Sequence, residues 1–149
     1  MATTETMNPV ALRLERKFDA APERVFNAWV NPQAVATWFG PTPEHKSVVT
    51  ALDARAGGNY RIEIVHTGGN VHVAFGTYRE VDPPNKIVMT WAWEGNTALG
   101  ESLVTVEFTP SGTGTQMVLT HELLPTEEAR EAHKKGWTGC FEKMGSFLA

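Results

Sequence analysis

The 149-residue sequence lacks the features of secreted and membrane-spanning proteins. Its single cysteine, Cys140, excludes a disulfide within the chain, which suits a reducing compartment and favours the cytoplasm. No apolar run approaches the ~18 residues that are needed to cross a bilayer. The first residues, Met1–Thr6, carry no basic segment followed by an apolar stretch, so we expect no secretory signal.

Clustered positive charge is also missing. Lysine and arginine number 13 against 17 aspartate and glutamate residues, and the formal net charge is −4. The basic residues are scattered, whereas a nucleic-acid-binding domain needs a basic face. We therefore expect no nucleic-acid partner, and the same scatter argues against binding to an anionic membrane surface.

Motifs for common catalytic and cofactor chemistry are absent. The sequence has no G-x-S-x-G, G-x-G-x-x-G or P-loop pattern, and we expect no cofactor. The five histidines form no H-x-x-x-H pair. Since His66 and His72 flank one predicted hairpin loop, we expect them to point to different faces, which predicts no metal site. Cys140 falls on the apolar stripe of a predicted helix, which indicates a buried, unreactive thiol.

Hydrophobic periodicity instead predicts an ordered series of strands and helices. Residues 1–9 are predicted to be a loose tail, followed by a single domain over residues 10–149. Alternation over Val10–Phe18 predicts a first strand, and Pro22 begins a helix that ends before Asn31-Pro32. A second short helix is predicted over Gln33–Phe39.

Six further strands follow, separated by turns that are rich in glycine, proline and asparagine. They are predicted over Val48–Leu52, Tyr60–His66, Val71–Val81, Lys86–Glu94, Leu103–Thr109 and Thr115–Glu122. Short turns between consecutive strands predict an antiparallel meander. In four of these strands, alternate apolar side chains define the face that we expect to be concave: Tyr60, Ile62, Ile64, Ile87, Met89, Trp91, Trp93, Val104, Val106, Phe108, Met117, Leu119 and His121.

A long final helix is predicted to cover that face. Thr126 can cap it, the acidic residues Glu127 and Glu128 occupy its first turn, and the helical spacing continues to Leu148. One helix is roughly 10 Å wide, whereas seven strands at ~4.8 Å each form a much wider surface. Either a ligand pocket remains between helix and sheet, or the aromatic side chains fill the space.

Several segments resemble the START-like (SRPBCC) superfamily and, within it, the family of activators of heat-shock-protein-90 ATPase (Aha-type). The motifs are similar in order along almost the whole chain. They are Phe18–Trp29, Ala36–Pro41, Gly57–Arg61, Gly76–Ile87, Thr90–Trp93, Leu119–His121 and His133–Trp137.

The resemblance implies an α+β helix-grip fold. In this fold a curved, seven-stranded antiparallel sheet surrounds a long C-terminal helix, with two short helices after the first strand, and encloses a deep cavity. The superfamily includes lipid carriers, polyketide cyclases and aromatases, and stress-related binding proteins. Its co-chaperone members carry an additional N-terminal domain, for which we expect no room in this chain.

We therefore predict a binding domain for a hydrophobic or aromatic small molecule rather than a well-defined enzyme. The alternatives are a cyclase-like or hydrolase-like enzyme that uses the same cavity, and an interaction module for a chaperone or another protein. Homodimerisation stays open. The predicted ligand-binding residues are Trp38, Tyr60, Ile62, Met89, Trp91, Trp93, His121, Trp137 and Phe141. His121 and Tyr78 are the candidate polar groups, although a structural role for His121 is the alternative.

Overall fold

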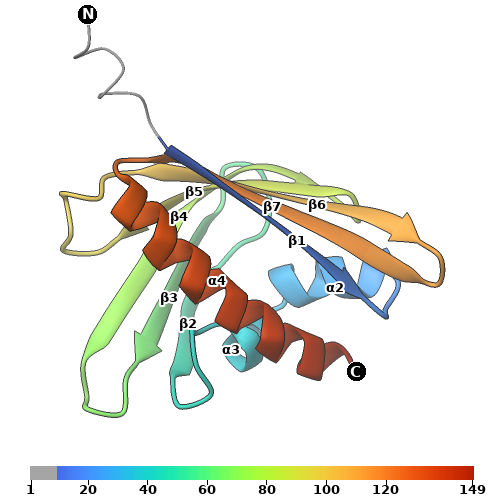
Figure 1. The fold of residues 1–149 in the computed structure, drawn as a ribbon, viewed down its shortest axis with the longest axis horizontal. Helices are drawn as coiled ribbons and strands as arrows, with labels where there is room; N and C mark the ends of the chain where they lie inside the picture. The colour runs from blue at the N-terminus through green and yellow to red at the C-terminus, as the bar shows by residue number, and fades with distance from the viewer. Residues whose placement is uncertain (1–9) are drawn as a thin grey trace, which may run out of the picture.

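A seven-stranded sheet and three helices make up residues 10–149, the part of the chain that the computed structural model describes (Figure 1). The tail expected over residues 1–9 lies outside it. The strands are β1 (Val10–Phe18), β2 (Lys46–Leu52), β3 (Asn59–Val65), β4 (Val71–Asp82), β5 (Lys86–Trp93), β6 (Ser102–Ser111) and β7 (Gly114–Leu124). The helices are α2 (Pro22–Val30), α3 (Pro32–Trp38) and α4 (Glu127–Leu148).

The strands are ordered β1-β7-β6-β5-β4-β3-β2, and each neighbouring pair is antiparallel. From β2 to β7 every strand pairs with the next one in the sequence, because short turns connect them. Strand β1 pairs with β7, which makes β1 and β2 the two edge strands of the sheet. Since α2 and α3 lie between these strands in the sequence, they connect the two edges. The predicted helix-grip fold is confirmed.

Strand alternation identified the concave face correctly. Tyr60, Ile62 and Ile64 of β3 are buried, whereas Arg61 and Glu63 between them are half-buried. Period-two patterning works here because only one face of the sheet is covered. The predicted concave residues of β5, β6 and β7 are likewise buried, apart from the half-buried Trp93.

Side-chain caps define where two of the helices begin. Asn31 Oδ1 accepts hydrogen bonds from the backbone N–H groups of Gln33 and Ala34 at the start of α3. Thr126 Oγ1 accepts from the N–H of Ala129 at the start of α4, as the sequence predicts. Within residues 10–149, no helix is long and apolar enough to cross a membrane.

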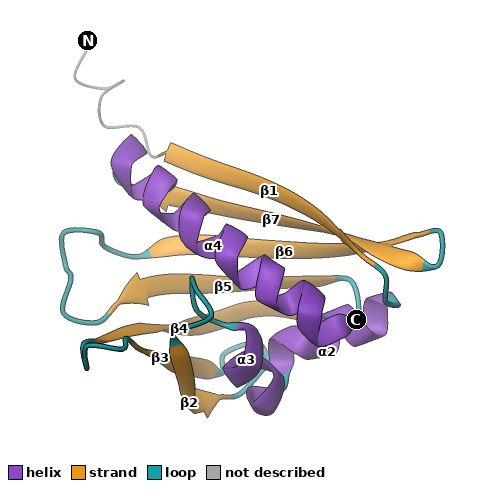
Figure 2. Cartoon of the chain, turned by 60° about the horizontal axis from the view of Figure 1, so that its bottom comes forward, coloured by secondary structure: helices purple, strands orange, loops and turns teal. Residues whose placement is uncertain are grey.

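Helix α4 runs across the concave side of the sheet but does not cover it evenly (Figure 2). It packs against β1 and β7 at one edge of the sheet, and against α2 and α3. The helix backbone packs less closely on the opposite part of the sheet, around β3, β4 and β5, than on β1 and β7. The position of α4 therefore allows a hollow on that side.

Two glycines on α4 have contrasting surroundings. A Cβ atom at Gly139 would lie 1.9 Å from the carbonyl oxygen of Pro41, whereas one at Gly136 would have no heavy atom within 4 Å. Gly139 therefore lets the helix approach the loop after α3, where the N–H of Gly40 also lies 3.3 Å from Cys140 Sγ. Gly136 makes no comparable contact.

These two positions give opposite predictions for alanine. Gly136→Ala raises the free energy of unfolding by up to about 1 kcal/mol, because alanine is the better helix former and the space is open. Gly139→Ala lowers it by about 1–3 kcal/mol, because the added methyl group meets backbone. Urea denaturation measures both. Equal effects of the two substitutions would contradict the close approach at Gly139.

Candidate functional site

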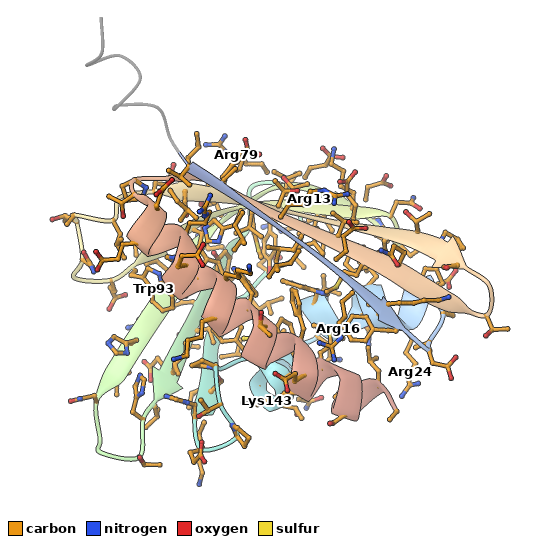
Figure 3. The ribbon with its side chains drawn as sticks, in the orientation of Figure 1. Arg13, Arg16, Arg24, Arg79, Trp93 and Lys143 are labelled. Atoms are coloured by element: carbon orange, nitrogen blue, oxygen red, sulfur yellow. The ribbon has the colours of Figure 1, made fainter. Side chains whose placement is uncertain are left out.

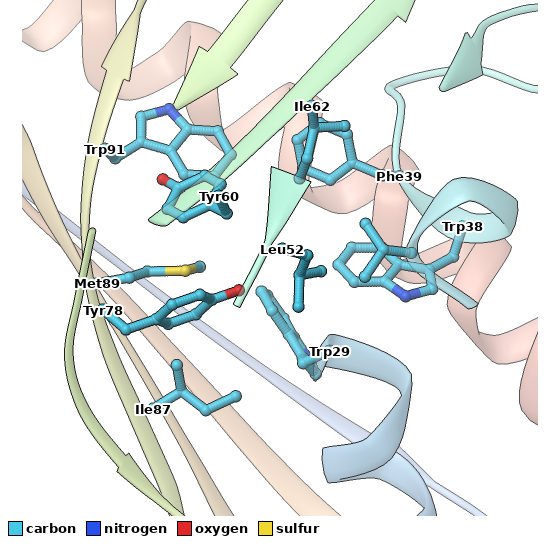
Figure 4. A pocket seen from close by; sticks show the side chains of 11 residues that line it. Trp29, Trp38, Phe39, Leu52, Tyr60, Ile62, Tyr78, Ile87, Met89 and Trp91 are labelled. Carbon is cyan, nitrogen blue, oxygen red and sulfur yellow. The ribbon is translucent and has the colours of Figure 1, made fainter. Parts of the chain in front are cut away.

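Aromatic side chains fill the space between α2, α3 and the middle of the sheet. The ring centroids of Trp29 and Trp38 are 4.8 Å apart, and those of Tyr60 and Tyr78 are 5.5 Å apart. A cavity of only about 20 Å³ remains among them (Figure 4), which is room for about one water molecule. It is lined by Trp29, Val35, Trp38, Phe39, Leu52, Tyr60, Ile62, Tyr78, Ile87, Met89 and Trp91.

A second cavity, of about 580 Å³, opens between α4 and the ends of β3, β4 and β5. Its apolar lining includes Phe39, Ile64, Trp91, Trp93 and Trp137. Its polar lining comes from the loop before β2, the β3–β4 hairpin, the end of β5 and α4. These polar residues are Thr42, His45, His66, His72, Glu94, Asn96, His133 and Lys135.

The structure distributes the predicted ligand-binding residues over different places. Trp91, Trp93 and Trp137 line the large cavity. Trp38, Tyr60, Ile62 and Met89 line only the small one, where they pack against one another. His121 and Phe141 are buried and line neither.

A row of small residues on α4 borders the large cavity, and of these residues only Cys140 was predicted from the sequence to lie on the apolar face. Ala132, Gly136 and Cys140 are four residues apart, so they share one face of the helix. Small side chains on that face leave the hollow open. The prediction for this helix used its stripe of large apolar side chains. The spacing of four between small residues is equally visible in the sequence.

Three tryptophans form the wall of the large cavity. The ring centroids of Trp91 and Trp137 are 5.0 Å apart, and those of Trp91 and Trp93 are 5.7 Å apart. Trp91 and Trp93 come from β5, where alternation places them on the same face. Trp137 faces them from α4, so the wall joins sheet and helix.

His133 fixes the orientation of Trp93 beside the N-terminal half of α4 (Figure 3). The indole Nε1–H of Trp93 donates to His133 Nε2 over 3.0 Å, and His133 Nδ1–H donates to the carbonyl oxygen of Ala129 over 2.7 Å. Both ring nitrogens are therefore occupied and the imidazole is neutral. Burial lowers the pKa of His133, which favours the same form.

His121 does the same for Trp137. The Nε1–H of Trp137 donates to His121 Nδ1 over 3.1 Å, His121 Nε2–H donates to Ser102 Oγ over 2.7 Å, and Ser102 donates to the carbonyl oxygen of Trp91. Burial, and secondarily the neighbouring His133, lower the pKa of His121 to about 3. Both ring nitrogens of His121 thus have protein partners, which fits the structural alternative for this residue.

The buried groups at the wall also include a thiol, Cys140, and the indole N–H of Trp91. Burial raises the pKa of the Cys140 thiol to about 11, as expected for an unreactive cysteine. The indole Nε1–H of Trp91 is a buried side-chain donor without a hydrogen-bond partner among the described residues. Its nitrogen points away from Tyr60 and Met89 (Figure 4). Such an unpaired donor is costly in an interior.

The expectation that His66 and His72 point to different faces is wrong. His72 pairs with Ile64 across the hairpin, and His66 lies two residues beyond Ile64, so both face the concave side. His66 Nε2 lies 2.6 Å from His72 Nδ1. Even so, no group of three or more His, Cys, Asp or Glu side chains within residues 10–149 has the arrangement of a metal site.

Acid should destabilise the protein in part through His121. The unfolded chain protonates this residue near a pKa of about 6.5, whereas the folded protein resists protonation until a pKa of about 3. The neutral form stabilises the fold fully above pH 6.5. This contribution is lost as the pH falls from 6.5 towards about 3, the pKa of His121 in the folded protein. One such group changes the free energy of unfolding by up to about 1.4 kcal/mol per pH unit.

His121→Asn tests this, because asparagine keeps hydrogen-bonding groups but does not titrate. Urea denaturation between pH 6 and 4 should show a shallower fall in the free energy of unfolding for the variant than for the wild type. Equal slopes would contradict a neutral His121 in the folded protein.

Comparison with known proteins supports the same architecture throughout. The family model described as "Activator of Hsp90 ATPase homolog 1-like protein" matches residues 19–149. A protein of Chromobacterium violaceum is 28% identical, with 93% of this chain and 96% of that chain covered and a TM-score of 0.86. The AHSA1 protein of Silicibacter pomeroyi is 29% identical over 93% and 97% of the two chains, with a TM-score of 0.81.

A protein of Rhizobium leguminosarum is also 29% identical, with 94% of each chain covered and a TM-score of 0.79. No curated protein matches the sequence. The family model covers most of the chain, including the wall of the large cavity and all of α4. This chain therefore belongs to the family of activator of Hsp90 ATPase homolog 1-like proteins.

Proposed function

We propose that this protein binds a hydrophobic small molecule in the large cavity between α4 and the ends of β3, β4 and β5. The observation that carries the proposal is a hollow of about 580 Å³ with a wall of three tryptophans. Ligand sites commonly have volumes of about 300–1,000 Å³ and mostly apolar linings. The START-like resemblance supports the same function, because that superfamily includes carriers of lipids and other apolar molecules.

The wall suits a flat or aromatic ligand in particular. Tryptophan offers a large apolar surface, and aromatic rings favour offset or edge-to-face contacts. His121 and His133 hold Trp137 and Trp93 in fixed orientations, which reduces the entropy lost on binding.

A binding function is better supported than an enzymatic one. Both nitrogens of His121 and of His133 already have protein partners. Neither imidazole can take a proton from a substrate without losing one of these hydrogen bonds. A cyclase or hydrolase would therefore need a different base.

An interaction module would need an apolar patch outside the cavity. Exposed apolar side chains do occur on the outer face of β2 and β4, at Val48, Val71 and Phe75. However, Arg61 and Glu63 lie in register between these strands, and Arg61 pairs with Glu63 at 2.8 Å and with Glu94 at 2.9 Å. Charge interrupts the patch, which disfavours this alternative.

We retain the cytoplasm as the proposed compartment. The chain has a single cysteine, Cys140, which is buried and free. A domain stabilised by its core without disulfides suits a reducing environment.

Filling the cavity should abolish binding. Gly136 lines the hollow and has open space around it, so Gly136→Phe places a ring inside, whereas Gly136→Ala adds only a methyl group. With N-phenyl-1-naphthylamine, a neutral fluorescent probe, we expect saturable binding to the wild type and to Gly136→Ala. Gly136→Phe should raise Kd at least tenfold.

Circular dichroism and urea denaturation check that each variant is folded. Absence of saturable binding to the folded wild type, or an unchanged Kd for a folded Gly136→Phe variant, would contradict the proposal.

A further inference from the structure

A chain of three histidines lies at one end of the large cavity. His45 precedes β2, His66 follows β3, and His72 lies in β4, so three separate segments bring them together. His45 Nε2 lies 2.5 Å from His66 Nδ1, and His66 Nε2 lies 2.6 Å from His72 Nδ1. Thr42 Oγ1 contacts His45 Nδ1 at the inner end. The hydrogen bonds that orient Trp93 and Trp137 involve none of these three histidines.

The chain leaves one nitrogen available. Among the described residues, Nε2 of His72 forms no hydrogen bond, while the other five ring nitrogens of the three histidines all have partners. If each N–H points towards His72, the Nε2–H of His72 is a free donor. The outer end of the chain can therefore donate to a molecule in the cavity.

The chain can also hold one additional proton without losing a link. His45 then donates from Nδ1 to Thr42 and from Nε2 to His66, His66 donates to His72, and His72 Nε2–H still points outward. Three rings carry four protons and one positive charge in this state. A second additional proton would place two N–H groups against each other, so the chain accepts only one.

The surrounding charges favour an anion at this end. Lys135 lines the cavity, and Lys143 Nζ donates to the carbonyl oxygen of Thr42 over 3.1 Å. Glu94 also lines the cavity, but its carboxylate pairs at 2.9 Å with Arg61, which also pairs with Glu63. Glu44, beside His45, is exposed to solvent. Two further titratable groups belong to the lining: His133 is held neutral by its two hydrogen bonds, and burial raises the pKa of the Cys140 thiol, which stays neutral.

We propose that the ligand is a hydrophobic acid, whose apolar body packs on the tryptophan wall and whose carboxylate accepts a hydrogen bond from His72. This inference rests on the proposed function of the cavity. Hydrogen bonds between charged partners are stronger than neutral ones, so the carboxylate favours the protonated chain. Binding of the anion therefore takes up one proton.

This linkage makes binding dependent on pH. Burial, and then the neighbouring His45 and His72, lower the pKa of His66, so this central ring is neutral at pH 8 in the empty protein. The ligand remains ionised between pH 8 and 6, because a carboxylic acid has a pKa of about 4. Affinity for the acid should rise as the pH falls, by up to about tenfold per pH unit.

A matched pair of probes, 2-naphthoate and the neutral 2-naphthamide, separates this inference from the proposed function. Isothermal titration calorimetry in two buffers with different ionisation enthalpies counts the protons taken up at pH 7.5. We expect about one proton with 2-naphthoate and none with 2-naphthamide. Between pH 8 and 6, Kd should fall only for 2-naphthoate.

The triple variant His45→Gln/His66→Gln/His72→Gln is decisive, because its amides keep hydrogen-bonding groups at the three positions while no ring remains that can take up the proton. It should bind 2-naphthamide like the wild type, which shows an intact cavity, and should lose the pH dependence of 2-naphthoate binding. Retained pH dependence in this variant would overturn the inference. The inference would also be overturned if the wild type bound 2-naphthamide and showed no preference for 2-naphthoate at pH 6. The proposed function would survive that result. Failure of both probes to bind would contradict both proposals.

Discussion

The structure depends on a mismatch of widths between one helix and seven strands. A helix is roughly 10 Å across, and α4 packs on β1, β7, α2 and α3 rather than on the whole concave face. The space between the helix and the rest of the sheet is packed on one side and open on the other. Near α2 and α3, aromatic rings pack together and leave about 20 Å³. At the ends of β3, β4 and β5, a hollow of about 580 Å³ is left.

Buried polar contacts keep that hollow from collapsing. An open cavity next to mobile aromatic rings would be filled by them, because dispersion contacts favour close packing. The hydrogen bonds from Trp93 to His133 and from Trp137 to His121 hold two of the wall rings in place. The same bonds keep both imidazoles neutral, so stability and cavity shape depend on one set of contacts. Gly136 contributes by supplying no side chain.

Much of the fold could be predicted from the sequence, because the signals were local. Alternation identified the concave residues of β3, β5, β6 and β7, and Thr126 marked the start of α4. The cavity was harder to predict, because its position depends on which end of the sheet α4 leaves uncovered. Trp38 and Trp91 are equivalent in the sequence as buried aromatics, yet Trp38 lines only the small cavity, whereas Trp91 lines both.

The histidine chain shows a second limit of sequence reasoning. The relative orientation of His66 and His72 follows from the hairpin register, in which Ile64 pairs with His72. A register shifted by one residue would separate them. The approach of His45 depends further on the loop after α3, which no local pattern specifies. Pairwise spacing in the sequence therefore could not identify the cluster.

The indole N–H signals of the five tryptophans in a ¹H–¹⁵N NMR spectrum test the central claim most directly, because Trp29 and Trp38 line only the small cavity, whereas the other three line the large one. On addition of a neutral aromatic ligand, the account predicts shifts for Trp91, Trp93 and Trp137, with Trp29 and Trp38 unchanged. Shifts confined to Trp29 and Trp38, or no shift in any of the five at saturating ligand, would contradict it.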